Sequence, residues 1–399
     1  MRLLLHDFAG HPFPAQLART LARRGVEVDH AFCSGVATGR GDLERRPDDP
    51  ATLRFSDISP TAFERYSPPK RIASEARYGA RLARHVRRTR PDVVLSGNTP
   101  LLAQAALWAA AASVGAARVY WVQDFLGRGT RGVLTARSPL LGRTLGAGLE
   151  RLETRLLRRS DRAIVISEDF VTELDRRSVS VPTTVVENWA PLDEITLEPK
   201  DNPWSRTHGL HDRPVALYAG TLGLKHDPAH LVAAAERLRG TGARLVVVTE
   251  GRGRDELERA RTATALDDVL VLLDYVPYAE LPQVLGAADV TLVLLEDEAG
   301  TFSVPSKVLA YLAAGRPVVA AMPAGNLATA TVERAGAGVV TRPGDHAAFA
   351  AAVADLLADD ERRAAAGAAA RAYATATFDI GRIADRIGEV LASAVRARG

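Results

Sequence analysis

Short apolar runs of β-strand type alternate with longer helical patterns along almost the whole chain. This alternation is typical of parallel sheets whose strands are joined by helices, and it constrains the fold more than any other feature. In the first half the predicted strands are 2–6, 27–33, 93–96, 117–122 and 163–167, and the predicted helices are 14–24, 73–88, 100–114 and 145–158.

The second half repeats this plan and ends in an alanine- and arginine-rich helical tail at 361–399. A single hydrophobic core stops growing at roughly 250–300 residues. The 399 residues of this chain therefore predict two α/β domains, each with a doubly wound sheet. The predicted strands here are 215–218, 244–249, 269–272, 290–294, 318–321 and 338–341, and the helices are 228–238, 254–264, 281–285, 307–314 and 347–357.

A polar, proline-containing segment separates the two alternating patterns and predicts a linker at 196–213. The N-terminal domain is then 1–195 and the C-terminal domain 214–375, and a helix at 376–399 is expected to pack back across both. Ligands of open parallel sheets bind beyond the carboxyl ends of the strands, where the strand order reverses. We expect the two domains to face each other across a cleft that holds the site.

Cysteine usage and the apolar runs predict a cytoplasmic protein. Cys33 is the single cysteine, which excludes an internal disulfide and any multi-cysteine metal site. The apolar run at 1–7 is shorter than a signal-peptide core. The run at 101–115 is shorter than the roughly 20 residues that a bilayer requires, so we expect no transmembrane helix.

Positive charge is concentrated in the first half of the chain. Residues 1–190 carry 29 Lys and Arg against 20 Asp and Glu, and the rest carries 22 against 28. Segment 70–90 resembles a basic amphipathic helix that could rest on an anionic membrane surface. The plainer reading, a solvated arginine-rich helix, is favoured. Nucleic acid is a weaker alternative, because few aromatic side chains stand among the arginines to stack on bases.

Two stretches of the second half have the pattern of phosphate-binding loops. In the first, Ser303, Val304, Ser306 and Lys307 lead into a predicted helix, and a helix start offers free N–H groups and partial positive charge to an anion. The second follows the strand at 215–218. It is a glycine turn that offers Gly220, Thr221, Gly223 and Lys225, so a nucleotide-linked donor is indicated.

Several ordered motifs resemble those of the retaining, nucleotide-sugar-dependent glycosyltransferases of family four, which have the GT-B fold of two facing Rossmann-like domains. The likeness is strongest to the branch similar to the colanic-acid and O-antigen fucosamine transferases. It covers nearly the whole chain. The matching motifs are 10–12 with the helix at 14–24, then 120–124, 164–168, 186–190, 218–223 and 303–319.

The resemblance implies transfer of a sugar from a nucleoside diphosphate, with UDP expected, to a glycan, lipid-linked or small-molecule acceptor with retention of configuration. It implies a cytoplasmic enzyme that acts on its nucleotide-sugar substrate without cofactor or metal. A peripheral position at the inner face of the membrane is the alternative. The rival hypotheses are a non-catalytic sugar-nucleotide-binding protein, an epimerase on the same fold and a natural-product tailoring transferase.

The resemblance also assigns roles to single residues. Glu250, Tyr275 and Val276 belong to loops that face the nucleotide base, and Gly10 belongs to the acceptor-side loop. Asp124 is expected to orient the acceptor or to stabilise an oxocarbenium-like transition state, with a structural cap as the alternative. His11 is expected to bind donor phosphate or acceptor, with a plain loop histidine as an equal alternative.

The chain departs from the family pattern at two positions. Glutamates that frame the phosphate loop in the family are replaced by Phe302 and Ala310, and the second of them holds the donor ribose in relatives. Glu296, Asp297 and Glu298 lie just upstream and could reach the sugar hydroxyls, although an acidic loop tip is more often solvated.

Overall fold

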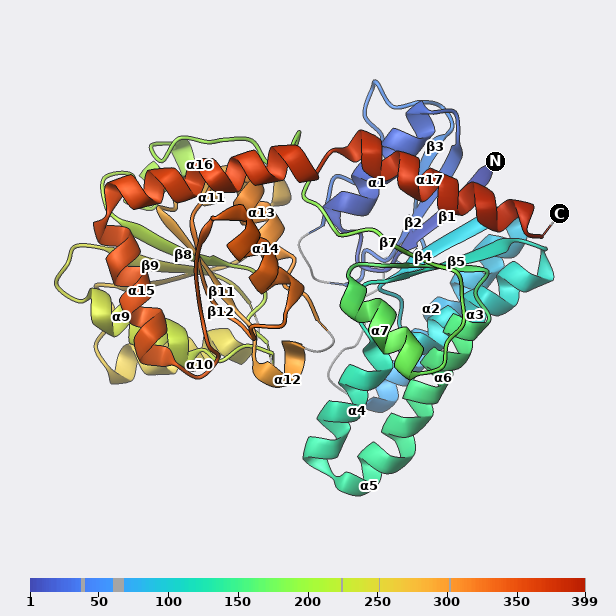
Figure 1. Cartoon of the computed structure of the whole chain (residues 1–399), viewed down its shortest axis with the longest axis horizontal. Coiled ribbons are helices and arrows are strands. Elements are labelled where there is room, and N and C mark those ends of the chain that lie inside the picture. Colours follow the sequence, from blue (N-terminus) through green and yellow to red (C-terminus); the bar gives the residue numbers. More distant parts are fainter. Residues whose placement is uncertain (37–39, 60–67, 224, 251, 301–302, 399) are drawn as a thin grey trace. The chain divides into compact units, whose positions relative to one another are not determined.

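A computed structural model of the chain describes residues 1–36, 40–59, 68–223, 225–250, 252–300 and 303–398. The fold divides into two compact units (Figure 1). Unit 1 is Met1–Asn188 with Asp379–Gly399, and unit 2 is Trp189–Phe378. Each unit is an α/β structure built on one parallel sheet. Among the described helices, none combines the length and apolar character needed to cross a bilayer.

These unit boundaries differ from the predicted ones at both ends of unit 2. The predicted linker, 196–213, lies within unit 2, because Asn202 caps the short helix α8 (Pro203–Thr207) and its side chain donates to the Gln283 carbonyl. The predicted C-terminal helix is α17 (Ile380–Arg396), which belongs to unit 1. Its apolar face packs on α1 and on two strands of that unit.

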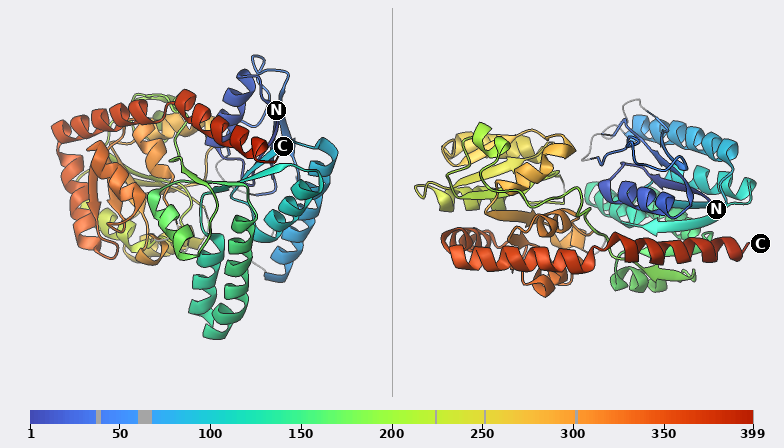
Figure 2. Two further views of the ribbon diagram at one scale, coloured as in Figure 1. Left: turned by 45° about the vertical axis from the view of Figure 1, so that its right-hand side comes forward. Right: turned by 90° about the horizontal axis from the view of Figure 1, so that it is seen from above.

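Unit 1 has a seven-stranded parallel sheet in the order β3-β2-β1-β4-β5-β6-β7. Helix α1 packs against α17, and α2 packs against α3, with the sheet between these two groups (Figure 2). The elements are β1 (Arg2–Asp7), α1 (Pro12–Arg23), β2 (Glu27–Phe32), β3 (Leu53–Asp57), α2 (Pro68–Thr89), β4 (Val93–Gly97), α3 (Leu101–Ser113), β5 (Ala117–Val122), α4 (Leu126–Arg137), α5 (Pro139–Leu141), η1 (Gly142–Gly146), α6 (Ala147–Arg158), β6 (Arg162–Val165), α7 (Glu168–Arg176) and β7 (Thr183–Val185).

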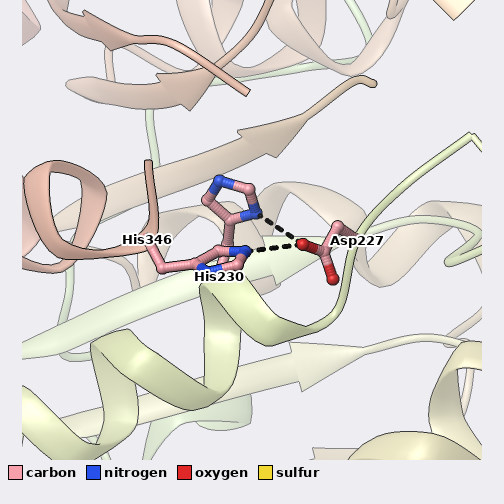
Figure 3. Close-up of side chains that lie close together, drawn as sticks. All are labelled: Asp227, His230 and His346. Atoms are coloured by element: carbon pink, nitrogen blue, oxygen red, sulfur yellow. Dashed lines mark hydrogen bonds and ion pairs between the residues drawn. The ribbon is translucent and has the colours of Figure 1, made fainter. Parts of the chain in front are cut away.

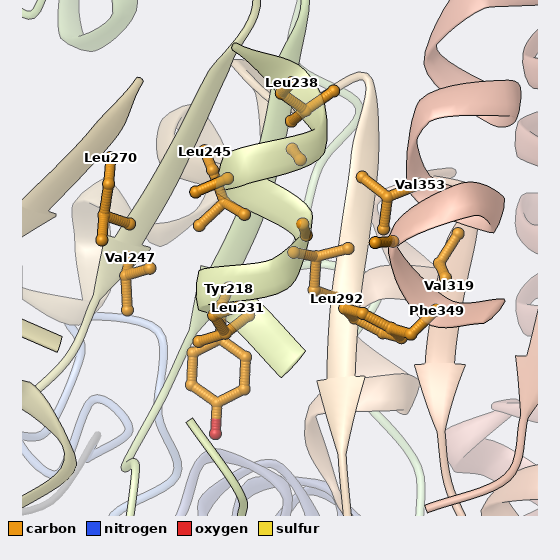
Figure 4. Close-up of a cluster of buried hydrophobic side chains, with 14 of the residues drawn as sticks. Tyr218, Leu231, Leu238, Leu245, Val247, Leu270, Leu292, Val319, Phe349 and Val353 are labelled. Atoms are coloured by element: carbon orange, nitrogen blue, oxygen red, sulfur yellow. The ribbon is translucent and has the colours of Figure 1, made fainter. Parts of the chain in front are cut away.

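Unit 2 has a six-stranded parallel sheet in the order β10-β9-β8-β11-β12-β13. A cluster of buried apolar residues lies between this sheet and helices α9 and α15, and it includes Leu231, Leu292 and Phe349 (Figure 4). The elements are β8 (Val215–Ala219), α9 (Ala229–Leu238), β9 (Arg244–Val248), α10 (Arg252–Ala263), β10 (Leu270–Leu273), η2 (Tyr278–Glu280), α11 (Leu281–Gly286), β11 (Val290–Leu294), α12 (Asp297–Gly300), α13 (Lys307–Ala313), β12 (Val318–Ala321), α14 (Leu327–Ala335), β13 (Gly338–Thr341), α15 (His346–Ala358) and α16 (Asp360–Thr377).

Each predicted strand is present, and the predicted α/β class with two parallel sheets is confirmed. The prediction missed both edge strands of unit 1, β3 and β7, which are short and only partly buried. It also missed α4, which pairs with α6 in a hairpin that extends away from the sheet (Figures 1 and 2).

Helix α2 is the basic helix that the sequence offered as a membrane surface. Its apolar residues Tyr78, Leu82 and Val86 are buried within unit 1, and Ile72 is exposed. The apolar face of α2 is therefore used by the core, because the helix packs on α3. The favoured reading, a helix with a solvated arginine face, agrees with this packing.

Buried ion pairs hold the base of the α4–α6 hairpin. The guanidinium of Arg177 contacts Glu153 at 2.7 Å and Glu173 at 2.7 Å, and lies 4.4 Å from the ring centre of Phe125. The second oxygen of Glu153 accepts the N–H of Gly127 at 3.0 Å. Because these carboxylates are buried, they have lost their hydration. Their ion-pair and hydrogen-bond partners offset the free energy that this loss costs.

We predict that Arg177→Met destabilises the protein by about 3–5 kcal/mol, because it leaves the buried carboxylate of Glu153 without its cation and removes one of the arginines paired with Glu173. The matched control is Arg176→Met. Arg176 also pairs with Glu173, but its side chain is 60% exposed, so its loss should cost less than about 1 kcal/mol. The midpoint of urea unfolding measures both changes. Equal midpoints for the two variants would contradict this account of the hairpin base.

Candidate functional site

The strand order of unit 2 brings two loops together. Strands β8 and β11 are neighbours in the sheet although β9 and β10 lie between them in the sequence. The loop after β8 and the loop after β11 therefore leave the same edge side by side, and Glu296 N–H donates to the Lys225 carbonyl at 2.9 Å. Such a reversal of strand order is where open parallel sheets bind ligands.

Lys307, the first residue of α13, points its amine at the end of β8. Its Nζ lies 3.6 Å from the ring centre of Tyr218. Among the described residues, no acceptor forms a hydrogen bond with this buried atom. Burial lowers the pKa of Lys307 to about 7. The amine is thus held out of water against one aromatic face, and the described part of the chain supplies no hydrogen-bonded carboxylate to balance its charge.

Gly220 lies directly beside this amine. Its φ of +133° is in the region that favours glycine, and a Cβ there would meet Lys307 Cε at 3.2 Å and Nζ at 3.3 Å. The backbone can therefore approach the amine closely only because the residue has no side chain.

A second cation, Lys225, lies nearby and donates to the Ser303 hydroxyl at 2.9 Å. Asn326, the N-cap of α14, holds the Ser303 loop by donating to the carbonyls of Gly300 and Ser303.

The charges of both lysines act on His226. Burial, and to a smaller extent the charges of Lys307 and Lys225, lowers the pKa of His226 to about 3. His226 is therefore neutral at pH 7, and its Nδ1 accepts the Gly223 N–H at 3.0 Å.

The other predicted donor residues lie at the same edge of the sheet. Thr221 and Tyr275 share a hydroxyl hydrogen bond of 2.6 Å, which joins the loops after β8 and β10. Glu250 follows β9, and Val276 follows Tyr275. Ser306, the exposed residue before α13, and the half-buried Val304 complete the loop.

The departures from the family pattern lie on the same loop and helix. Ala310 stands in α13 three residues after Lys307, and Phe302 lies outside the described residues. Of the acidic residues upstream, Asp297 and Glu298 are exposed and Glu296 is half-buried. Burial raises the pKa of Glu296, and the charges of Asp227, Glu298 and Asp297 raise it further.

Unit 1 has its own reversal of strand order, between β1 and β4. Asp7 ends β1, is buried, and accepts the backbone N–H of His11 at 2.5 Å and its ring Nδ1 at 2.9 Å. Asn98, which follows β4, donates to the other Asp7 oxygen at 3.2 Å. Gly10, with φ +72°, makes the turn between Asp7 and His11.

The charges around His11 favour its protonated form. Burial alone would lower the pKa of His11, but the carboxylate of Asp7 and the hydrogen bond to it, with the charge of Asp124, raise the pKa above its ordinary value. Asp124 is half-buried and directly follows the Tyr120–Gln123 segment, at the end of β5. The structure therefore brings His11, Asp7 and Asp124 to one edge of the unit 1 sheet.

Sequence reasoning missed four residues that shape these two edges: Asp7, Asn98, Tyr218 and His226. Asp7 stands four residues before His11, a spacing that could have revealed the pair. Tyr218 stands in the predicted strand 215–218 and in the motif 218–223, but nothing in the sequence shows that Lys307 reaches its ring.

Two family models match the chain in sequence. Residues 11–189 match the glycosyl transferase 4-like domain, and residues 201–373 match glycosyl transferases group 1. Together the two matches cover most of the chain.

Curated relatives are 27–29% identical to this chain over about half to two thirds of its length. "Probable glycosyltransferase WbjE" of Pseudomonas aeruginosa is 27% identical over 66% of this chain and 66% of its own length. The GDP-mannose-dependent α-(1-6)-phosphatidylinositol monomannoside mannosyltransferase of Mycolicibacterium smegmatis is 29% identical over 54% of this chain and 59% of its own. These matches span about three fifths to two thirds of the relatives' lengths.

Solved structures share the GT-B fold with the whole chain. Sucrose-phosphate synthase of Thermosynechococcus elongatus has a TM-score of 0.74 at 18% identity, with 100% of both chains covered. HepE of Anabaena, in complex with UDP and glucose, has a TM-score of 0.72 at 17% identity and covers 98% of this chain with 100% of its own. At these identities the likeness establishes the fold of the chain as GT-B.

We predict that the imidazole of His11 titrates above the ordinary histidine value of about 6.5, because it faces Asp7. Asp7→Asn should bring this pKa down, whereas Asp57→Asn, at another strand end of unit 1, should leave it unchanged. Nuclear magnetic resonance of ring-labelled histidine measures the titration. The ion pair's contribution to stability is lost as pH rises through the His11 pKa. A His11 pKa that is equal in the native and Asp7→Asn proteins would contradict the pairing.

Proposed function

Because the chain belongs to the group 1 glycosyltransferases of family four, we propose that it transfers a sugar from a nucleoside diphosphate, UDP, to an acceptor hydroxyl with retention of configuration. The observation that carries this proposal is the buried amine of Lys307, which lies beside Gly220 and has no acceptor among the described residues. A diphosphate supplies the missing anion. That HepE forms complexes with UDP and UDP-glucose supports the choice of nucleotide.

In the proposed reaction, the bond between the anomeric carbon and the diphosphate oxygen breaks, and UDP leaves with the electron pair. The acceptor oxygen forms the new bond and gives its proton to the departing diphosphate oxygen. Negative charge grows on the departing diphosphate, and Lys307 and Lys225 stabilise that charge in the transition state. We assign Gly220, Gly223, Ser303 and Ser306 to the phosphates as well.

The remaining assignments extend the same proposal. Thr221, Tyr275 and Val276, with Glu250, would border the nucleoside, and Val304 would line the phosphate loop. In unit 1 we assign acceptor-side roles to Gly10, His11 and Asp124. With Asp7 holding its ring, His11 can present a charged N–H to an oxygen of either substrate.

A binding protein without transferase activity is the second candidate. Ala310 favours it, because this position lacks the carboxylate that would hold the ribose hydroxyls in the family pattern. The two candidates differ in a simple assay, since only a transferase releases UDP from UDP-sugar when acceptor is supplied.

The similarity to the α-D-kanosaminyltransferase of Streptomyces kanamyceticus, 26% identical over 50% of this chain and 52% of its own, makes a small-molecule acceptor the alternative to a glycan.

We further propose that the acceptor is lipid-linked and that the α4–α6 hairpin docks on an anionic membrane surface. Seven large apolar side chains are exposed in the described part of the chain, and four of them lie in this hairpin. Segment 126–158 also carries seven arginines against two glutamates, and both glutamates are paired with arginine. Apolar side chains among arginines suit an anionic headgroup layer. The four are Val133, Leu140, Leu141 and Leu145.

We predict that Lys307→Met weakens UDP binding by about tenfold to a hundredfold, the range for loss of a hydrogen bond to a charged group. Methionine keeps the apolar stem against Tyr218 and removes the charge, so the fold should stay intact. Lys70→Met, at an exposed lysine of unit 1, is the control. Isothermal calorimetry measures the affinities, and unchanged affinity in Lys307→Met would exclude this residue from the donor site.

We predict that the affinity for UDP measured in this way depends on pH. The free amine loses its proton above a pKa of about 7, and the diphosphate prefers the charged amine. UDP affinity should therefore fall by up to tenfold for each pH unit above 7, with uptake of a proton on binding. The terminal phosphate of UDP titrates near 6, so measurements above pH 7 isolate the lysine. Lys307→Met should lose this slope, and an equal slope in both proteins would assign the proton to another group.

We predict that the double variant Leu140→Ser/Leu141→Ser binds anionic phospholipid vesicles at least about tenfold more weakly than the native chain, because each leucine loses its burial in lipid. Leu197→Ser removes an equally exposed leucine of unit 2 and serves as the control. Vesicle co-sedimentation measures binding. Equal sedimentation of the native chain with anionic and neutral vesicles, or of the double variant with the native chain, would refute the docking surface.

A further inference from the structure

Three potential metal ligands of unit 2 meet beside the loop after β8. Asp227 ends that loop, His230 lies in the first turn of α9, and His346 is the first residue of α15. Helices α9 and α15 pack against each other on the sheet, which brings together residues that are 119 positions apart in the sequence. Figure 3 shows both imidazoles turned toward the carboxylate of Asp227.

The distances suit coordination of one small ion. His346 Nε2 lies 2.6 Å and His230 Nδ1 lies 3.6 Å from the same oxygen, Asp227 Oδ2. The ligand atoms all lie within 4.8 Å of one another. Metal–ligand bonds of about 2.0–2.2 Å place tetrahedral ligand atoms roughly 3.3–3.6 Å apart, so small side-chain adjustments suffice.

His230 supplies an independent reason to expect a ligand. Its side chain is 1% exposed, and neither ring nitrogen has a hydrogen-bond partner among the described residues. It packs against Phe349, with ring centres 5.3 Å apart. A buried imidazole without a partner costs free energy, because it gives up its hydrogen bonds to water. A metal ion at Nδ1 would replace one of them.

Backbone hydrogen bonds fix the carboxylate of Asp227 and the start of the helix that carries His346. Asp227 Oδ1 accepts the N–H of Ala229 at 2.9 Å, which leaves Oδ2 for the imidazoles. Asp345 caps α15 by accepting the N–H of Ala348 at 3.0 Å, and so fixes the start of the helix that carries His346. The hydrogen bond to Asp227 Oδ1 is an outer-shell contact of the kind typical of metal ligands.

We propose that Asp227, His230 and His346 bind a divalent transition-metal ion, with water in a fourth position. Two imidazoles and one carboxylate suit Zn²⁺ in tetrahedral geometry. The family resemblance implies no metal, and in the sequence only Asp227 and His230 of these three residues lie near each other. The ion would tie the loop after β8, which carries Lys225 two residues before Asp227, to α15. Its role is structural and does not depend on the proposed transfer reaction.

The test uses untagged full-length protein, stripped of metal and then supplied with Zn²⁺ or Co²⁺. We expect about one ion per chain by elemental analysis, a visible absorption band from bound Co²⁺, and a higher melting temperature with Zn²⁺. His346→Ala should fold, because His346 is 40% exposed, and should bind the ions at least about 10- to 100-fold more weakly.

Two matched variants keep the result interpretable. Asp227→Asn retains the shape of the ligand and should also weaken binding, whereas His208→Ala, at an exposed histidine of the same unit, should bind like the native chain. Stoichiometric binding that depends on His346 and Asp227 supports the site. Failure of the native chain to bind either ion at micromolar concentration, or equal binding by His346→Ala, would overturn it and leave a metal-free hydrogen-bonded cluster.

Discussion

The pairing of β8 with β11 decides where the chemistry of unit 2 lies. Because these parallel strands are neighbours although β9 and β10 lie between them in the sequence, their following loops leave one edge of the sheet together. Gly220 and Lys225 come from one loop, and Ser303 and Lys307 come from the other. The pairing of β1 with β4 does the same in unit 1 for Asp7, His11 and Asn98. Each unit thus gathers these polar groups at the edge of its sheet where the strand order reverses.

At the unit 2 edge, the fold keeps a cation in an unfavourable environment. The Lys307 amine is buried against the Tyr218 ring, and desolvation lowers its pKa to about 7. A buried charge without an anion costs free energy, and an aromatic face offsets only part of that cost. An anionic ligand that reaches past Gly220 removes the penalty, so relief of the buried amine contributes to the free energy of binding. Such preorganised charge also acts on a leaving group without further rearrangement.

Much of this could be predicted from the sequence, and the failures have physical reasons. Each buried central strand was found because parallel strands covered on both faces form continuous apolar runs, whereas the short, partly exposed β3 and β7 do not. Glycine and lysine after a strand predicted two phosphate loops, and the structure places both loops at one edge of the unit 2 sheet. Contacts between side chains that are far apart in the sequence could not be predicted. The ring under Lys307 and the approach of His346 to Asp227 depend on packing between helices and strands, and the unit boundary at Asn188 depends on α8 packing within unit 2.

The central claim is that a nucleoside diphosphate binds at the end of β8 with its phosphates on the Lys307 amine. A crystal structure of the chain with UDP tests it most directly. The account predicts a phosphate oxygen within hydrogen-bond distance of Lys307 Nζ, close to the backbone of Gly220. UDP bound elsewhere, with the amine still facing only the Tyr218 ring, would contradict it.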